Sequence, residues 1–536
     1  MRLQTKQTRS NAAPGSLEHW VRKPDPRLWG NAQRPPHGQF GLCQPDVGRA
    51  DEFCLKRDQL VFIFLQLQDT MGFFKEKSVE DVENGSELKP DDATNIQGQT
   101  DAVFGEVVEG GPNYRNVSWI GSSILMMKTQ IGLGVLSIPA AFDTLGLIPG
   151  IISLIAIGLI TLWSGYIVGV FKVRHPETYG IEDVGQKLFG RAGREVLGLG
   201  FALFWTCVAG SGMLGISIAL NSLSEHGACT AIFVAVACIV GFLLSSIQTL
   251  SKISWIAWVG LAGILSAIIT LTVSVGLQDR PAAAPQFGPW ESDFELFKSP
   301  TFAEAAAALS SLIFAYAGTP AYFNIVSEMK DHKEYFKALS LCQFVMTALY
   351  VAIGVVVYYY CGSFVASPAL GSAGVLMKKI CYGLALPGLL ASVILVTHIT
   401  AKYFFIRTLR GTRHLNHNTP KHWIVWFGFT SGVSLTAYII ASAIPVFGGL
   451  VSLVGALLGT LMCFQPMGAM WLYDNWSRSN RDWKWKAMVA WSAFVIVSGT
   501  FLMIGGTYGS ILGIVDSYNK DGGTAAWTCA DNSNSS

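Results

Sequence analysis

The segment Ser310–Met329 reads SSLIFAYAGTPAYFNIVSEM, and its apolar run is interrupted at the middle by Gly318, Thr319 and Pro320. Proline lacks a backbone N–H group and glycine permits backbone angles that other residues avoid, so these residues predict a break in a helix. Backbone groups left free by such a break persist inside a membrane only where they line a cavity. The segment therefore predicts a membrane helix that is unwound at its centre.

A second interrupted run, MMKTQIGLGVLSIPAAF, covers residues 126–142. Here Gly132 and Gly134 flank Leu133, and Pro139 follows five residues after Gly134. Glycine and proline also serve close packing and kinks in membrane helices, so each break alone has an alternative interpretation. The presence of two such breaks favours a transporter, in which two discontinuous helices face a substrate at the membrane midplane.

Apolar runs of about 20 or more residues recur from Trp119 onward, and each is long enough to cross a bilayer as a helix. We place eleven of them near residues 119–142, 146–171, 196–221, 228–247, 254–277, 302–327, 338–361, 380–406, 421–442, 446–472 and 486–514. Alternating patterns typical of barrel strands are absent, so we expect an all-α polytopic membrane fold. The breaks come first in spans 1–5 and first in spans 6–10, which predicts a 5+5 inverted repeat plus one extra helix.

The composition agrees with a membrane protein. The 536 residues are 51% hydrophobic and only 14% charged, and the net charge of +2 is too small to indicate a nucleic-acid partner. The bilayer is the partner that we expect. If the N-terminus is cytosolic, the inner connections hold 17 Lys and Arg residues and the outer ones five. This asymmetry predicts a cytosolic N-terminus and, with eleven spans, an outer C-terminus.

Three regions follow from this division. We expect a disordered cytosolic head at residues 1–118, a membrane domain at 119–514 and an extracellular or luminal tail at 515–536. Met71 opens an ordinary start sequence, so residues 1–70 have the alternative interpretation of an extension absent from the native protein. Mass spectrometry of the purified N-terminus distinguishes the two.

The ten cysteines are spread without the spacing of a metal site, and we interpret most of them as packing residues. Cys229, Cys361, Cys381 and Cys529 fall near the outer face, where one disulfide is the alternative. The sequence does not give a pairing.

Two stretches carry a family resemblance. GLGVLSIPAAF at residues 132–142 and FAYAGTPAYFNIVSEMKD at residues 314–331 resemble the amino acid/auxin permease family of the amino acid, polyamine and organocation superfamily. The resemblance covers about residues 115–515 and is nearest to the fungal neutral amino acid permeases of the system N type. It implies the five-plus-five repeat and proton-coupled symport of neutral amino acids, with no enzymatic activity, no cofactor and no metal.

The resemblance also implies how a substrate is bound, mainly through backbone groups. The α-carboxylate would meet amides near Gly132, Leu133 and Gly134. The α-amino group would meet carbonyls of Phe314, Tyr316 and Ala317. The expected side-chain pocket holds no ionised group, which favours neutral substrates, and its members are Gln130, Tyr316, Thr319, Phe204 and Ser211.

Two departures from the family pattern bear on the identity of the coupling ion. Sodium-coupled relatives usually place Asn just before the first break, where this chain has Thr129, and many members place His in the second break, where it has Thr319. Both departures favour protons over sodium. Lys128 lies roughly 13 Å into its span. Our hypothesis is that it projects between spans 1 and 8, toward the cation site of sodium-coupled relatives, and that its protonation accompanies substrate binding. The alternative is a structural lysine held by carbonyls at the break.

Span 8 contributes two more coupling candidates. Thr397 aligns with a cation-site Thr of sodium-coupled relatives, and His398 is the only histidine well within an apolar run. Histidine titrates near neutral pH, although we prefer a packing role for this one. Lys402, closer to the cytosolic end, is interpreted as an interfacial anchor.

Glu328, Lys330 and Asp331 end span 6 and are candidates for an inner gate with the basic loop at residues 187–194. Interfacial placement of these charges is the preferred alternative. For the whole chain, the rivals to plasma-membrane import are a vacuolar exporter of the same family and an amino acid sensor that does not transport. The loops cannot separate the two membranes, because the orientation to the cytosol is the same in both.

Overall fold

The computed structural model describes residues 100–101, 105–106, 116–132, 134–248, 250–281, 283–415, 417–444, 446–479, 481–520, 527 and 529–533. All of them belong to one unit, Thr94–Ser536. The predictions for the first 99 residues, including a start at Met71, lie outside the described part, as does Leu133 in the first break.

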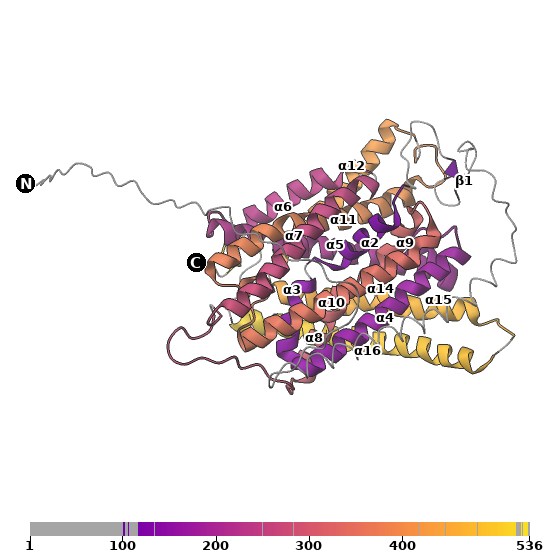
Figure 1. The fold of residues 1–536 in the computed structure, drawn as a ribbon. Coiled ribbons are helices and arrows are strands. Elements are labelled where there is room, and N and C mark those ends of the chain that lie inside the picture. The colour runs from indigo at the N-terminus through magenta and orange to yellow at the C-terminus, as the bar shows by residue number, and fades with distance from the viewer. Residues whose placement is uncertain are drawn as a thin grey trace, which may run out of the picture. The chain divides into compact units, whose positions relative to one another are not determined.

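The described residues confirm a polytopic helical membrane protein, whose helices lie side by side in Figure 1. The long helices, each of at least 24 residues, are α4 (Leu147–Arg174), α5 (Ile181–Ser224), α7 (Leu250–Leu277), α10 (Tyr335–Cys361), α11 (Val375–Leu409), α12 (Pro420–Ala443) and α16 (Trp483–Lys520). A shorter apolar helix, α6 (Thr230–Ser245), lies at the predicted fourth span. The interrupted spans are α2 (Trp119–Gln130) with α3 (Gly134–Leu145), α8 (Phe302–Tyr316) with α9 (Thr319–Ser327), and a run from α13 to α15.

Both predicted breaks are present. The axes of α2 and α3 differ by 47° across Ile131 and the two residues that follow it. Ala317 and Gly318 separate α8 from α9, and Pro320 lies in the first turn of α9, where its missing N–H group is not needed.

Span 3 begins earlier than predicted. Helix α5 starts at Ile181 rather than near residue 196, because a short helical segment precedes the apolar run. The two parts meet at Gly190, whose φ of 66° is readily adopted only by glycine. The length of the apolar run does not reveal this extension, because several residues between Ile181 and Gly190 are polar.

Span 10 is less regular than predicted. It consists of α13 (Phe447–Val454), the π-helical turn η4 (Gly455–Gly459), α14 (Thr460–Cys463) and α15 (Gln465–Asn475). A side chain at Gly455 would come within 2.1 Å of the Ser310 carbonyl oxygen, so this glycine allows η4 to contact α8 closely. Helix α16 packs against α8, α15 and η4.

A small hairpin and short 3-10 turns complete the described structure. Strands β1 (Thr100–Asp101) and β2 (Gly105–Glu106) pair antiparallel within the region that we predicted to be disordered. The 3-10 turns are η1 (His332–Glu334), η2 (Gly362–Phe364) and η3 (Ala369–Ser372). The head also ends before residue 118, because Ser118 caps α2 through its hydroxyl and Val117 pairs with Met329.

Helix α11 lies at the centre of the contacts that matter for the site. It packs against α5, α6, α7 and α12 and also reaches α2. Helix α3 packs against α8, and α9 contacts α2 and α4. The two broken spans are therefore in contact through their half-helices, with α11 and α5 beside them.

Candidate functional site

The two broken spans meet at their breaks. A Cβ atom on Gly134, the first residue of α3, would lie 2.5 Å from the Cα atom of Ala315 in α8. A Cβ atom on Gly318 would lie 2.4 Å from the Thr129 hydroxyl oxygen at the end of α2. Each break thus has a glycine at its contact with the other broken span. The two breaks lie so close together that no side chain fits at either position.

Turn-like hydrogen bonds organise the backbone of the second break. The Ala317 N–H group donates to the Phe314 carbonyl at 3.2 Å, and the Gly318 N–H group donates to the Tyr316 carbonyl at 2.8 Å. The Ala315 carbonyl accepts from the Tyr350 hydroxyl at 2.8 Å. A carbonyl oxygen has two lone pairs, so those of Phe314 and Tyr316 can each accept a second donor, such as an ammonium group.

Two buried polar atoms near the breaks lack a hydrogen-bond partner of ordinary geometry among the described residues. They are Oε1 of Gln130, which is 4% exposed, and Oγ1 of Thr319, which is fully buried. The other end of the Gln130 amide donates to the Tyr322 hydroxyl at 2.5 Å. Buried polar atoms are normally satisfied, so these two indicate a place where a polar ligand or water would bind.

The remaining predicted pocket residues are buried, but their printed contacts lie within the protein. Tyr316 donates its hydroxyl to Thr347 of α10 and packs edge-on against Tyr350. Ser211 donates to the Cys207 carbonyl within α5, and the ring of Phe204 packs against Trp205. The Tyr316 hydroxyl is therefore hydrogen-bonded to α10.

Two residues near the breaks were missed from the sequence. Tyr322 contacts Gln130, and it lies three residues after Thr319 on the same helix face, a spacing that could have identified it. Ser392 of α11 has its hydroxyl 3.1 Å from the Cβ position of Gly132. Nothing in the sequence signals this second contact, because it joins segments 260 residues apart.

Lys128 is 1% exposed and makes two hydrogen bonds with backbone carbonyls. Its Nζ atom lies 3.1 Å from the Ile131 oxygen, at the end of α2, and 2.9 Å from the Gly388 oxygen of α11. The lysine thus reaches from span 1 to span 8, at the carbonyl end of a half-helix where a positive charge is favoured.

The other coupling candidates lie elsewhere. The Thr129 hydroxyl donates to the Met126 carbonyl at 2.7 Å. Thr397 and His398 are fully buried in α11, about 13–15 Å along the helix from Gly388. The ring of His398 packs edge-on against Trp426 of α12 at 5.3 Å between centroids. The structure therefore does not bring His398 to Lys128.

The C-terminal end of α9 is held by a buried ion pair. Lys402 Nζ lies 2.5 Å from Glu328 Oε1, with side-chain exposures of 3% and 2%. Our interpretation of Lys402 as an interfacial anchor is therefore wrong, because the carboxylate of Glu328 allows its ammonium group to be buried. The Glu328 carbonyl also accepts from Val117 N–H, whose own carbonyl accepts from Lys330 N–H.

The expected partner of this gate, the basic loop, makes other contacts. Lys187 pairs with Glu177 at 2.6 Å, and this hydrogen bond lowers the pKa of the Glu177 carboxyl. Asp331 is exposed and accepts from Lys333 N–H. Of the three predicted gate residues, Glu328 is buried, whereas Lys330 and Asp331 are exposed. The exposure of Lys330 and Asp331 agrees with the alternative that these charges lie at the interface.

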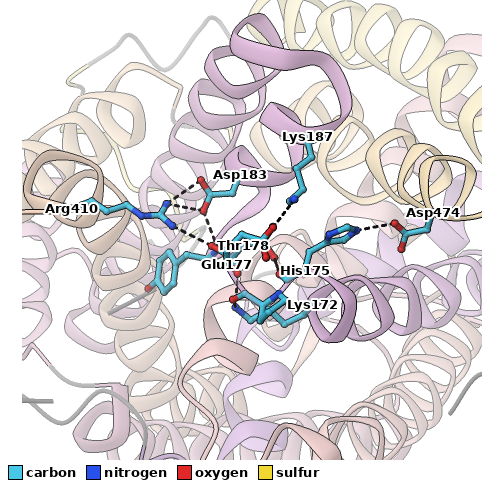
Figure 2. A network of polar contacts seen from close by, with 10 residues as sticks. Lys172, His175, Glu177, Thr178, Asp183, Lys187, Arg410 and Asp474 are labelled. Atoms are coloured by element: carbon cyan, nitrogen blue, oxygen red, sulfur yellow. Dashed lines mark hydrogen bonds and ion pairs between the residues drawn. The ribbon is translucent and has the colours of Figure 1, made fainter. Parts of the chain in front are cut away.

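A separate polar network ties the α4–α5 connection to two other helices (Figure 2). His175 meets Asp474 of α15 at 2.9 Å, and Arg410, just after α11, meets Asp183 at 3.1 Å. Lys172 donates to the carbonyls of Pro176 and Thr178. This network holds the loop at residues 175–180 against α5, α11 and α15.

The helical fold and the two broken spans, which meet at their breaks, are those of a multi-pass membrane transporter. Residues 115–512 match the family model described as transmembrane amino acid transporter protein, and the chain belongs to that family. The resemblance seen in the two motifs is thereby confirmed.

Two fungal relatives match most of the chain. A protein named transmembrane transporter from Fusarium pseudograminearum is 33% identical over 442 residues, which are 82% of this chain and 92% of the relative. The N amino acid transport system protein of Neurospora crassa is 30% identical over 432 residues, 79% of this chain and 91% of the relative. A solved structure of a Na+-coupled sialic acid symporter covers 75% of this chain and 91% of its own, at 15% identity and a TM-score of 0.47.

Proposed function

We propose that this transporter is a proton-coupled symporter of neutral amino acids. Support for the substrate class comes from the breaks, where backbone carbonyls are buried beside Gln130 Oε1 and Thr319 Oγ1. These two atoms lack a hydrogen-bond partner of ordinary geometry among the described residues, and the pocket side chains named above carry no charge. Half-helix ends that carry opposite partial charges suit a zwitterion. A charged substrate side chain would find no counter-ion among Gln130, Tyr316, Thr319, Phe204 and Ser211.

The observation that carries the coupling proposal is the position of Lys128. Its ammonium group is 1% exposed and bound to two neutral carbonyls, and no carboxylate in the described part of the chain forms an ion pair with it. Burying a charge in a membrane protein is unfavourable, and such residues mark ion and proton pathways. Loss of a proton would relieve the burial, and arrival of a substrate carboxylate would favour its return. Proton binding and substrate binding are linked in this way.

For its place in the cell, we propose the plasma membrane, with the N-terminus in the cytosol and the C-terminus outside. The excess of Lys and Arg on the inner connections supports this orientation. A disulfide between Cys229 and Cys529 supports it as well, because both cysteines would then face an oxidising compartment.

We also propose that the Glu328–Lys402 ion pair is the inner gate. It ties the end of α9 to α11, and the Val117 pairing ties the chain before α2 to the same point. Both cytosolic half-helices must leave these contacts for a path to open on that side. Lys330 and Asp331, which follow at the surface, would contribute little.

Uptake by the purified protein in liposomes tests the function. Radiolabelled neutral, acidic and basic amino acids are offered under an inward proton gradient or a sodium gradient. We expect a neutral amino acid to accumulate under the proton gradient alone. Accumulation only with sodium would contradict the coupling proposal, and binding without uptake would favour a sensor.

A further inference from the structure

The C-terminal residues 527 and 529–533 are bound to the outer ends of four helices. A disulfide joins Cys529 to Cys229, which precedes α6. This pair confirms the alternative of one disulfide among Cys229, Cys361, Cys381 and Cys529, whose pairing the sequence did not give. The Trp527 N–H group donates to the Ser442 carbonyl of α12, and its ring packs against Tyr438 at 5.2 Å.

Asn532 binds two side chains of α5. Its Oδ1 atom accepts from Asn221 Nδ2 at 2.7 Å, and its Nδ2 atom donates to Ser217 Oγ at 3.0 Å. Both partners belong to α5 and are fully buried. Thr230 of α6 also binds both sides, accepting from Asn221 and donating to the Ala530 carbonyl at 2.7 Å. The tail therefore completes the hydrogen bonds of buried side chains between α5 and α6.

The start of α11 is bound too. Lys378 Nζ donates to the Ser533 carbonyl at 2.5 Å, and the Asp531 side chain accepts from Ser533 N–H. The six described residues of this tail thus contact α5, α6, α11 and α12, and these four helices all pack on one another. Two of these four helices also carry residues of the candidate site. Helix α5 contains Ser211, and α11 contains Gly388, whose carbonyl accepts a hydrogen bond from Lys128.

We propose that residues 527 and 529–533 belong to an outer strap, held closed by the Cys229–Cys529 disulfide and released by reduction. The disulfide keeps Asn532 at high local concentration beside Asn221 and Ser217, and Asn532 fixes the outer ends of α5 and α6. An external dithiol opens the strap by giving two electrons and two protons, which leaves two thiols here and converts the dithiol to a disulfide. Release leaves buried polar groups of α5 unpaired and loosens the four-helix group.

The test compares oxidised protein with the same preparation reduced by dithiothreitol after folding. Hydrogen exchange of the peptide spanning residues 217–232 and the melting temperature are read first. We expect faster exchange and a lower melting temperature after reduction. Asn532→Ala in the oxidised protein should reproduce the faster exchange, and Cys529→Ser should reproduce both effects and become insensitive to dithiothreitol. Adding Asn532→Ala to Cys529→Ser should change exchange little further, because the disulfide acts by holding Asn532.

A matched pair of lysines separates the strap from general charge effects. Lys378→Gln removes a contact with the tail, whereas Lys379→Gln removes the neighbouring ion pair with exposed Glu225. Only Lys378→Gln should speed exchange at residues 217–232. If reduction and Asn532→Ala both leave exchange unchanged, there is no strap and the disulfide is a passive cross-link.

The effect on transport rests on the proposed function. Reduction should raise the KM for the amino acid by about 5-fold, the factor equivalent to one net hydrogen bond, because α5 and α11 also carry the site. An unchanged KM with faster exchange would overturn the connection to the site. If neither the oxidised nor the reduced protein takes up any amino acid, the proposed function is contradicted. Hydrogen exchange at residues 217–232 and the melting temperature would still test the strap.

Discussion

The Nζ atom of Lys128 lies 2.9 Å from the carbonyl oxygen of Gly388, so a buried lysine of the first broken span is bonded to the eighth span beside the break. This contact joins the half-helix α2 to α11, which also holds Lys402 nearer its C-terminus. Two lysines thus connect α11 to one half-helix of each broken span, to α2 directly and to α9 through Glu328.

Lys128→Ala should abolish the response to a proton gradient. We expect concentrative uptake to fall by about 10-fold or more, a change of at least 1.4 kcal/mol in the driving step, while exchange of labelled for unlabelled substrate persists. Uptake into liposomes at several external pH values measures the first, and counterflow measures the second. Lys172→Met is the matched control, since Lys172 is another buried lysine bonded to two carbonyls, but outside the breaks. Full proton-driven uptake with unchanged pH dependence in Lys128→Ala would show that the lysine is structural.

Gly134→Ala should stop transport by separating the two broken spans. The added Cβ atom would lie 2.5 Å from the Ala315 Cα atom, so α3 and α8 must move apart. Overpacking of this kind destabilises by about 1–3 kcal/mol, which a melting curve detects. Gly428→Ala is the control, because nothing lies within 4 Å of its Cβ position in α12 and alanine favours helix. Normal uptake by Gly134→Ala would mean that the breaks tolerate separation.

Removing one partner of the Glu328–Lys402 pair should destabilise the folded protein strongly. An unpaired buried charge is unfavourable by about 3–5 kcal/mol, so Glu328→Gln and Lys402→Met should each lower the melting temperature. The double variant should be more stable than either single one, since it buries no lone charge. Additive losses in this cycle would show that the two residues do not act as a pair. A cysteine placed at Ser327 should gain alkylation from the cytosolic side in the single variants if the pair is the gate.

His398→Gln should leave proton coupling unchanged. The ring packs against Trp426 and is about 15 Å along α11 from Gly388, so a loss of packing is the expected effect. Reversal potentials measured in liposomes at two proton gradients report the number of protons moved per substrate. A reduced number of protons would assign His398 to the coupling path and weaken the role of Lys128.

Several features could be predicted from the sequence because each depends on neighbouring residues. Apolar run lengths indicated the spans, since a bilayer imposes a minimum helix length. Gly132, Gly134, Gly318 and Pro320 indicated the breaks, because backbone freedom and a missing N–H group are local properties. The same local patterns carried the family resemblance that the family model confirmed.

Other features required the tertiary structure. Lys402 looked like a membrane-surface lysine, and only its pairing with Glu328, 74 residues away in sequence, explains its burial. The partner of Cys229 is 300 residues away, and Asn532 reaches Ser217 over 315 residues. Such contacts depend on how complete helices pack, and no local spacing encodes them. The sequence alone therefore determined a membrane-spanning chain with two breaks, and the packing of α5, α6, α9 and α11 decided which buried polar groups meet.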